Sequence, residues 1–331
     1  MIPLFFAFLV CAAAQAGREA ASPPAPLVEL ARIPLGDVEG RIDHLALDEA
    51  RAHLFVAARA QGALVVLDLA GKSVWKRIDG LREPQGLLYL PETDQLWVSE
   101  GGRDALDVHA GATLELVERL RLGPDADNLR CDARAGRVWL GYASGALAVL
   151  DARERKALGR VKLPAHPEAF ALESAGARLF VDVPSERGVC VVDREKLQQI
   201  AFWPIESAQA NYPLLLLEGE KHLFVGCRSP AKLVVLDSDA GKEVLALELS
   251  GDVDDLCLDE AHARIYAACG AGTLDVFERR APANMWKRRA VLETASGART
   301  ALYSPARKQL FLAVPKSGER AAEIRVFEAR D

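Results

Sequence analysis

Residues 40–82 read GRIDHLALDEARAHLFVAARAQGALVVLDLAGKSVWKRIDGLR, and the rest of the chain repeats the pattern of this stretch. It contains four short apolar runs, separated by charged residues or turn formers, at positions 44–47, 53–57, 63–67 and 74–78. Runs of this length between turn formers are typical of antiparallel strands joined by tight turns. The stretch therefore predicts one four-stranded unit.

The second run of this unit recurs along the whole chain. Its copies are Leu54-Phe55-Val56, Leu96-Trp97-Val98, Val138-Trp139-Leu140, Leu179-Phe180-Val181, Leu223-Phe224-Val225, Ile265-Tyr266-Ala267 and Leu310-Phe311-Leu312. Successive copies are 42, 42, 41, 44, 42 and 45 residues apart, which is the period of a propeller blade. A helical solenoid can have a similar period, but these apolar runs are too short for helices and show no 3.6-residue stripe. The sequence thus predicts an all-β fold, a seven-bladed β-propeller.

The two ends of the repeat predict how the ring closes. The seventh unit supplies three strands and ends near Phe327, without a fourth apolar run. One spare run, residues 27–33, precedes the first unit. We expect this N-terminal strand to complete the last blade, which would leave no unpaired sheet edge at the closure. The predicted propeller therefore covers residues 27–331.

Composition and the N-terminal residues bear on the compartment. The net charge of −6, with no basic strip, argues against nucleic-acid binding. Residues 1–16 are apolar and end in Ala14-Gln15-Ala16, which predicts a cleaved secretory signal and a mature chain starting near Gly17; an uncleaved anchor is the alternative. Residues 17–26, rich in proline, read as a flexible leader. We expect a periplasmic or secreted protein, monomeric, with no transmembrane span in the mature chain.

Five cysteines would remain after cleavage, each inside an apolar run, where a buried thiol is the usual outcome. Cys227 and Cys269 occupy the same position in neighbouring units and form the one pair worth testing as a disulfide, although matching positions in adjacent blades are usually too far apart. No Cys-x-x-Cys motif is present, so a zinc or thioredoxin-like site has no support.

Three motifs carry a resemblance to a known group. They are the Asp-His-Leu-Ala-Leu-Asp opening that starts at Asp43, the Leu-Phe-Val second run, and the Leu-Val-Val-Leu-Asp turn entry followed by Gly-Lys at 71–72 and 241–242. The chain resembles the bacterial YVTN-type, or YncE-like, seven-bladed propellers over residues 27–331, with weaker similarity to lactonase and NHL-type propellers. The Tyr-Val-Thr-Asn tetrapeptide itself is absent. The resemblance implies the fold and a location outside the cytoplasm, but no reaction, since propellers host many unrelated activities.

The first strand of each propeller blade lines the central channel, so the residue before it should lie at the channel mouth. Aligning the units on their second strands gives one such mouth residue per blade: Asp43, Gln85, Asp127, Glu168, Tyr212, Asp254 and Arg299. Two residues earlier stand Arg41, Glu83, Asp125, His166, Ala210, Asp252 and Gly297, and one residue later His44, Gly86, Asn128, Ala169, Pro213, Asp255 and Thr300. These columns are largely polar, whereas the next position is apolar in every unit.

Several interpretations of this mouth stay open. We predict a ligand-binding site made of Arg41, Asp43, His44, Glu83, Asp127, Asn128, His166, Glu168, Tyr212, Asp254 and Arg299. Its oxygen-rich side chains could hold Ca²⁺ or a cationic or sugar-like ligand, and Arg41, Asp43 and Arg299 could simply pair across the ring closure. Ordinary solvation of a wet channel would also explain polar residues there.

Basic residues of the loops between second and third strands could form a rim over this mouth; these are Arg59, Arg103, Arg187, Arg228 and Lys316. The absence of catalytic motifs such as Gly-x-Ser-x-Gly and His-Glu-x-x-His favours a binding or scaffold module for an unidentified small molecule or protein. A metal-dependent hydrolase of the lactonase kind, with Asn128, Glu168 and Asp254 as ligands, is the alternative that the resemblance suggests. A redox propeller has least support, because no haem-attachment motif occurs.

Overall fold

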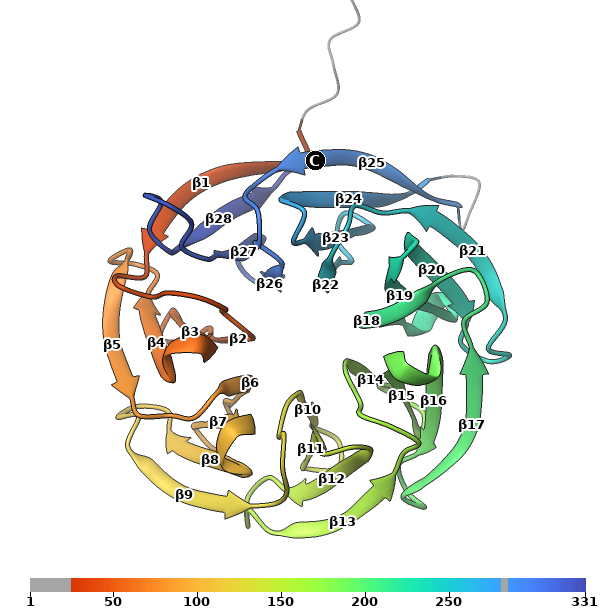
Figure 1. Ribbon diagram of the computed structural model, residues 1–331, viewed down its shortest axis with the longest axis horizontal. Coiled ribbons are helices and arrows are strands. Elements are labelled where there is room, and N and C mark those ends of the chain that lie inside the picture. The colour runs from red at the N-terminus through yellow and green to blue at the C-terminus, as the bar shows by residue number, and fades with distance from the viewer. Residues whose placement is uncertain (1–24, 281–284) are drawn as a thin grey trace, which may run out of the picture.

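Seven four-stranded antiparallel sheets form a closed ring in the computed structural model, which describes residues 25–280 and 285–331. Figure 1 shows the sheets as blades around a central channel, with the first strand of each blade innermost. The predicted seven-bladed propeller is therefore confirmed. The predicted signal peptide and residues 17–24 of the predicted leader lie outside the described residues.

The blades follow one another in chain order. Blade 1 contains β2 (Leu45–Asp48), β3 (His53–Ala58), β4 (Ala63–Asp68) and β5 (Ser73–Asp79), and blade 2 contains β6 (Pro84–Leu90), β7 (Gln95–Glu100), β8 (Ala105–Ala110) and β9 (Leu116–Arg121). Blade 3 contains β10 (Leu129–Asp132), β11 (Arg137–Tyr142), β12 (Ala146–Asp151) and β13 (Ala157–Lys162), and blade 4 contains β14 (Phe170–Leu172), β15 (Arg178–Val183), β16 (Gly188–Asp193) and β17 (Gln198–Pro204). Blade 5 contains β18 (Gln209–Leu217), β19 (His222–Ser229), β20 (Ala231–Asp237) and β21 (Glu243–Glu248), and blade 6 contains β22 (Val253–Asp259), β23 (Arg264–Cys269), β24 (Thr273–Arg280) and β25 (Met285–Glu293). Blade 7 contains β26 (Thr300–Ser304), β27 (Gln309–Val314), β28 (Glu323–Ala329) and β1 (Leu27–Pro34).

The helices of the described chain are four short 3-10 turns. They are η1 (Arg59–Gln61), η2 (Gly101–Arg103), η3 (Pro184–Glu186) and η4 (Glu218–Glu220). The first three connect the second and third strands of their blades, on the face where the first strands begin. No described helix is long and apolar enough to span a bilayer.

The N-terminal strand closes the ring, as the sequence predicts. β1 pairs antiparallel with β28, from Leu27 opposite Ala329 to Pro34 opposite Glu323, with one bulge between Glu29 and Ala31. Figure 1 shows β1 as the outermost strand of blade 7. The last sheet therefore contains both ends of the described chain, so the ring cannot open without breaking this pairing.

The core lies between neighbouring blades. In the anchor of blade 1, Leu54 and Val56 pack in a cluster with blade 7, while Phe55 packs in another cluster with blade 2. All three side chains are fully buried. Strands alternate their side chains between two faces, so the three consecutive anchor residues of a second strand that is covered on both faces are all apolar. This explains why the second run is the most regular part of the repeat.

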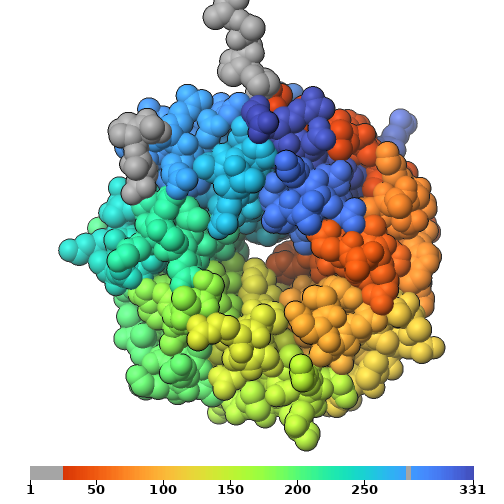
Figure 2. Space-filling model, turned by 180° about the vertical axis from the view of Figure 1, so that it is seen from behind, coloured from red at the N-terminus to blue at the C-terminus, as the bar shows by residue number. Residues whose placement is uncertain are grey.

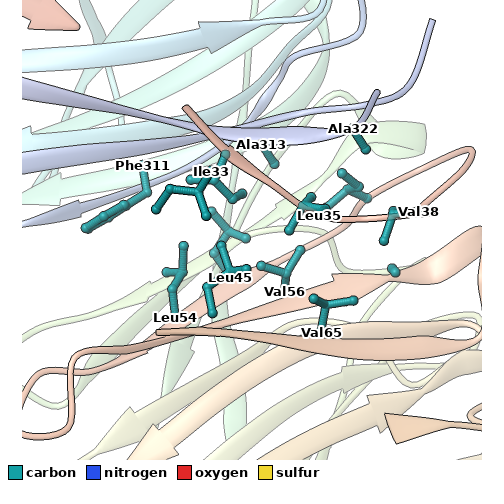
Figure 3. Packing of buried hydrophobic residues seen from close by; sticks show 14 of the residues in the cluster. Ile33, Leu35, Val38, Leu45, Leu54, Val56, Val65, Phe311, Ala313 and Ala322 are labelled. Atoms are coloured by element: carbon teal, nitrogen blue, oxygen red, sulfur yellow. The ribbon is translucent and has the colours of Figure 1, made fainter. Parts of the chain in front are cut away.

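The clasp formed by β1 contributes to this core as well as to the sheet. Ile33 is 1% exposed and packs with Phe311 of blade 7 and Leu54 of blade 1, as Figure 3 shows. Leu35 and Val38, which follow β1, are buried in the same cluster. The N-terminal segment therefore packs its apolar side chains between the last blade and the first.

Two further sequence predictions can be compared with the structure. The aspartate at the end of the third strand caps the following turn, since Asp68 Oδ1 accepts the backbone N–H of Ala70 at 2.9 Å, and the equivalent aspartates of blades 3, 4 and 5 bond in the same way. The candidate Cys227–Cys269 disulfide does not form: all five described cysteines are free. The two thiols belong to different packing clusters of adjacent blades, which keeps them apart.

Candidate functional site

The backbone fixes the mouth residues at the start of the inner strands. The N–H of Asp43 donates to Ala57 O at 2.8 Å, that of Asp127 to Gly141 O at 2.9 Å, and that of Glu168 to Asp182 O at 3.0 Å. The apolar residue two positions after each mouth residue pairs with the last residue of the second-strand anchor, for example Leu45 with Val56. The same register holds in all seven blades, including blade 5, where a bulge precedes Leu214 and still leaves Tyr212 at the mouth.

The column two residues earlier has a backbone role that sequence reasoning missed. Its members in blades 2, 3, 5, 6 and 7 have a positive φ, between 49° and 81°, and are Glu83, Asp125, Ala210, Asp252 and Gly297. Aspartate and glycine tolerate this left-handed conformation better than most residues. Part of the polarity of this column thus comes from the turn that leads into each inner strand, not from a ligand.

A small cavity of about 60 Å³ lies where the inner strands converge. Eight of the eleven predicted site residues line it: Arg41, Asp43, His44, Asp127, Asn128, Glu168, Tyr212 and Asp254. The other three do not: Glu83 pairs with Arg59 at 2.8 Å, His166 lines a neighbouring cavity, and Arg299 pairs with aspartates of blade 6. Figure 2, which views the ring from behind, shows the molecule hollowed at its centre.

Asp127 is flanked by two histidines. Its Oδ1 lies 3.8 Å from His44 Nε2, and its Oδ2 lies 3.8 Å from His166 Nε2. His166 Nδ1 donates to the carbonyl of Ala143 at 2.6 Å, which orients the ring with Nε2 toward the carboxylate. His44 and His166 are far apart in the sequence and belong to different blades. The ring of blades brings both to one carboxylate.

This arrangement changes the acidity of all three groups. The Asp127 carboxylate raises the pKa of His166 to about 9 despite partial burial. Burial lowers the pKa of His44, but the Asp127 carboxylate and the charge of Asp43 outweigh burial and raise the pKa to about 9. Burial raises the pKa of Asp127, and the two histidines more than reverse that effect, so its pKa lies well below the ordinary value. At neutral pH the three groups therefore form a cation–anion–cation array.

Arginines neutralise two more mouth aspartates. Asp43 Oδ2 lies 3.2 Å from Arg41 Nη2 and 3.8 Å from Arg59 Nη1. Asp254 binds Arg228 from the end of β19 and lies 3.1 Å from Arg299 Nε. Of the five basic loop residues that could form a rim, Arg59 and Arg228 reach mouth aspartates, so the mouth is charge-paired instead of simply acidic.

The predicted pairing of Arg299 across the ring closure is wrong. One interpretation of the sequence is that Arg299 of blade 7 pairs with Arg41 and Asp43 of blade 1; the charge of Asp43 does act on Arg299, but the two form no ion pair. Instead Arg299 Nη1 lies 2.8 Å from Asp252 Oδ2, and its Nε contacts Asp254, so it pairs with blade 6. The left-handed turn at Asp252 brings two carboxylates of blade 6 to one guanidinium, whereas Asp43 is already occupied by Arg41 and Arg59.

Two carboxyl groups at the mouth have no basic partner. The side chain of Glu168 makes no hydrogen bond or ion pair within the described residues, and burial together with the charge of Asp127 raises its pKa to about 7. Asp255 accepts the backbone N–H of Ala301 at 2.8 Å, and burial raises its pKa to about 7. These groups can gain or lose a proton near neutral pH.

A second, larger cavity of about 410 Å³ opens between blades 4 and 5. Its lining includes His166, Glu168 and Tyr212, together with residues of η3 and of the first strand of blade 5. Glu168 and Tyr212 line both cavities, so the larger cavity adjoins the mouth. The Tyr212 ring is stacked under Arg228, whose guanidinium carbon lies 3.8 Å from the ring centroid, and this contact holds the aromatic wall in place.

Arg130 and Ser99 are site residues that sequence reasoning did not identify. Arg130 lines the central cavity, donates to Leu129 O at 2.8 Å, and has a pKa lowered by burial. Ser99 donates to Asp127 O at 2.7 Å and accepts the N–H of Gly86, so it ties blade 2 to the mouth residue of blade 3. A signal for Arg130 exists in the repeat alignment, because the other six units have Ala, Leu or Cys at its position.

The candidate calcium ligands are not arranged as a metal site. Within residues 25–280 and 285–331, no group of three His, Cys, Asp or Glu side chains is placed to hold a metal ion. Asp254 is engaged by two arginines, and the Oδ1 of Asn128 accepts a hydrogen bond from Arg130 at 3.4 Å. A divalent cation would have to displace these guanidinium groups.

The comparisons with known proteins bear on the fold. No family model matches the chain, and no curated protein matches it. Among solved structures, the WD40 repeats of RRP9 are similar at a TM-score of 0.79 and 8% identity, covering 91% of this chain and 98% of that one. A chain of the mitotic checkpoint complex has a TM-score of 0.75 at 13% identity, covering 100% and 99%.

A chain of hydrazine synthase from Kuenenia stuttgartiensis is also similar, with a TM-score of 0.73, 12% identity, and coverage of 91% and 96%. At these identities the similarity supports the seven-bladed propeller with WD40-like neighbours, and nothing about a ligand or a reaction.

Proposed function

We propose that this protein is a binding propeller that takes a small polar ligand at the channel mouth. One observation carries the proposal: charged and polar side chains from six of the seven blades line one small cavity, and a larger cavity adjoins it. Small-molecule sites are concave and place a few convergent polar groups against an apolar wall. Tyr212, Pro213 and Leu214 supply such a wall here.

We further propose that the protein works outside the cytoplasm, as a relative of the YVTN-type propellers. The apolar N-terminal segment with its Ala14-Gln15-Ala16 ending supports export, and the repeat motifs support the kinship. N-terminal sequencing of the protein from the periplasm of a bacterial host tests the first point. We expect a new N-terminus near Gly17; an intact Met1 on cytoplasmic protein would contradict it.

A thermal-shift screen with a library of polar metabolites tests the binding function. A compound that binds only the folded chain raises its melting temperature. The mouth variant is Asn128→Ala, and the matched control is Glu154→Gln, which changes an exposed carboxylate in the turn between β12 and β13. We expect at least one compound to stabilise the wild type and the control but not Asn128→Ala. Equal stabilisation of all three proteins, or no stabilising compound, would refute a mouth site.

Protein docking is a second candidate, favoured by the outer surface of the ring. The outer strands expose large apolar side chains at Trp75, Val117, Ile200, Phe202 and Val244, among others. One similar chain comes from a structure named for the mitotic checkpoint complex, which is an assembly. Chemical crosslinking in a periplasmic extract tests this candidate. A partner captured by the wild type but not by an Ile200→Ser/Phe202→Ser variant would support docking at β17.

A further inference from the structure

Glu168 differs from the other mouth carboxylates in having no partner. Asp43 lies beside Arg41, Asp127 beside two histidines, and Asp254 beside two arginines. Within the described residues the Glu168 side chain has neither a hydrogen bond nor an ion pair. A buried or half-buried carboxylate without a partner loses solvation and gains nothing in return. The position of the Glu168 carboxylate is therefore explained best by a bound ligand that supplies its partner.

The side cavity next to Glu168 is large enough for such a group. Its volume of about 410 Å³ lies within the range of ordinary small-molecule sites. Besides Glu168 and Tyr212, its lining offers hydroxyl, amide and guanidinium groups from Ser185, Arg187, Gln209 and Ser229. Both charged and neutral hydrogen-bonding groups thus face one space.

The walls of the cavity come from the turn of blade 4 and the long inner strand of blade 5. Blade 4 connects its middle strands through η3, which carries Pro184 and Ser185 into the lining. The inner strand of blade 5, β18, has nine residues, whereas β2 has four. Its extension pairs Gln209 with Ser229 beyond the level of the mouth. The helical turn of one blade and the lengthened hairpin of the next are the two walls of the cavity.

Arg187 provides the opposite charge on the blade 4 wall. It follows η3, is exposed, and its side chain makes no hydrogen bond or ion pair within the described part of the chain. Glu168 and Arg187 line the same cavity but do not pair with each other. One cavity therefore presents an unpaired anion toward the channel and an unpaired cation beside η3.

We propose that the side cavity binds a small zwitterion, with its ammonium group on Glu168 and its carboxylate on Arg187. Charge-assisted hydrogen bonds of both kinds are stronger than neutral ones, and guanidinium groups bind carboxylates in a bidentate manner. The hydrocarbon part of the ligand would lie along Pro184, Ala210 and the Tyr212 ring. This inference rests on the proposed binding function and names its ligand class.

Other charges around the cavity are compatible with this assignment. His166 lines the cavity and carries a positive charge at neutral pH, but Asp127 and Asp125 lie 3.8 Å and 3.6 Å from its ring nitrogens. Arg228 is engaged by Asp254 and Asp252. The charges of Asp127 and Asp254 act on Glu168 and favour a cation beside it, whereas the charges of His166 and Arg41, neither of which forms an ion pair with Glu168, act in the opposite sense.

Calorimetric titration with a series of ω-amino acids of increasing chain length tests the proposal. The half-ligands are an alkylamine and an alkylcarboxylate of the same length, and the variants are Glu168→Gln and Arg187→Gln. Lys196→Gln is the control, since Lys196 is an exposed residue of the turn between β16 and β17. We expect one chain length to bind best, each half-ligand to bind at least about tenfold more weakly, and each cavity variant to lose about tenfold or more in affinity.

Proton release gives a second measurement. Because Glu168 has a pKa of about 7 in the free protein, an ammonium group bound to it should release a proton below neutral pH. Titration in two buffers of different ionisation enthalpy measures this release, which Glu168→Gln should abolish.

The proposal is overturned if no ω-amino acid binds, if the alkylamine binds as tightly as the zwitterion, or if Arg187→Gln has no effect. A failure of this kind is distinct from a failure of the binding function. If another polar compound stabilises the wild type but not Asn128→Ala, only the zwitterion assignment is wrong. If no compound of either experiment binds, both are wrong.

Discussion

Replacing Asp127 by asparagine should change the pH dependence of stability in a defined direction. The folded chain holds a proton on His44 and on His166 up to about pH 9, whereas an unfolded chain loses these protons near the ordinary value of 6.5. The stabilisation from the two histidines is therefore complete below about pH 6.5 and disappears as the pH rises through 9. The Asp127→Asn substitution would remove the shared anion and, with it, the largest favourable part of this contribution; Asp43 and Asp125 would still act on the histidines.

The size of the effect follows from the same pKa values. A rise from 6.5 to about 9 corresponds to roughly 3 kcal/mol for one isolated histidine. The two imidazoles share a single carboxylate, and their side chains are 24% and 28% exposed, so screening by solvent reduces the sum. We expect Asp127→Asn to lower the free energy of unfolding by about 2 kcal/mol near pH 6, and by much less at about pH 9.5.

Urea denaturation across this pH range measures the free energies, and NMR titration of the imidazole carbons measures the two pKa values directly. Asp125→Asn is the matched control, because Asp125 is 56% exposed and contacts only His166 of the pair, at 3.6 Å. It should lower the pKa of His166 slightly and leave that of His44 unchanged. Two histidines titrating near 6.5 in the wild type, or a stability difference that does not vary with pH, would refute the cation–anion–cation array.

Three further predictions concern the ring, the turns and metal. Ile33→Ala should lower the free energy of unfolding by about 3 kcal/mol, because Ile33 is 1% exposed on the N-terminal strand. Leu30 is 44% exposed on the same strand, so Leu30→Ala should lower it by less than about 1 kcal/mol. Equal losses in urea denaturation would contradict the role of the buried face of β1 in closing the ring. Ala210→Gly should raise the free energy of unfolding by about 1 kcal/mol, because Ala210 has a φ of 58°. Gly297→Ala, at a φ of 81°, should lower it by about as much. A loss of stability in Ala210→Gly would contradict the left-handed turn. Adding Ca²⁺ or a chelator should leave the melting temperature unchanged, since arginines already engage Asp254; a rise of several degrees with Ca²⁺ would show that the ion displaces them.

The repeat made the fold predictable from the sequence alone. The tripeptide that starts at Leu54 is buried on both faces of its strand, so its pattern tolerates little variation and recurs in every blade. Closure by residues 27–33 was also predictable from the repeat, since the last unit supplies only three of its four strands and needs a fourth strand from elsewhere in the chain. The register then followed from the anchors, because each mouth residue stands two positions before the inner-strand residue that pairs with the end of the anchor.

Side-chain partners at the mouth were not predictable in the same way. A register alignment says which residues share a level of the channel, but long arginine side chains reach from other levels. Arg228 extends from the end of β19 to Asp254 of the next blade, and Arg299 turns back to blade 6 instead of toward Asp43. The turn geometry at Asp252, which the sequence pattern does not reveal, decides which carboxylates Arg299 meets.

Deviations from the repeat were the stronger signal for individual residues. Arg130 is the one charged residue in a column of Ala, Leu and Cys, and it lies in the central cavity. Asp182 stands in a column of Ala, Ser and Gly and is fully buried, where its Oδ1 accepts a hydrogen bond from the amide of Asn211 at 2.8 Å. Burial raises the pKa of Asp182 well above the ordinary value. Comparing each unit with the other six would have identified both residues.

The arrangement of charge gives a physical reason to place recognition between blades 4 and 5. A ring that puts one polar residue of each blade at the same level accumulates like charges, and their repulsion must be offset for the ring to close. At the mouth aspartates of blades 1, 3 and 6 the offset comes from Arg41, the two histidines and Arg299. The mouth carboxylate of blade 4 has no ion-pair partner of this kind, because Glu168 faces a cavity and the charges of His166 and Arg41 act on it only from a distance. The charge that the fold leaves uncompensated is then the charge that a ligand can bind most favourably, since binding there breaks no existing ion pair.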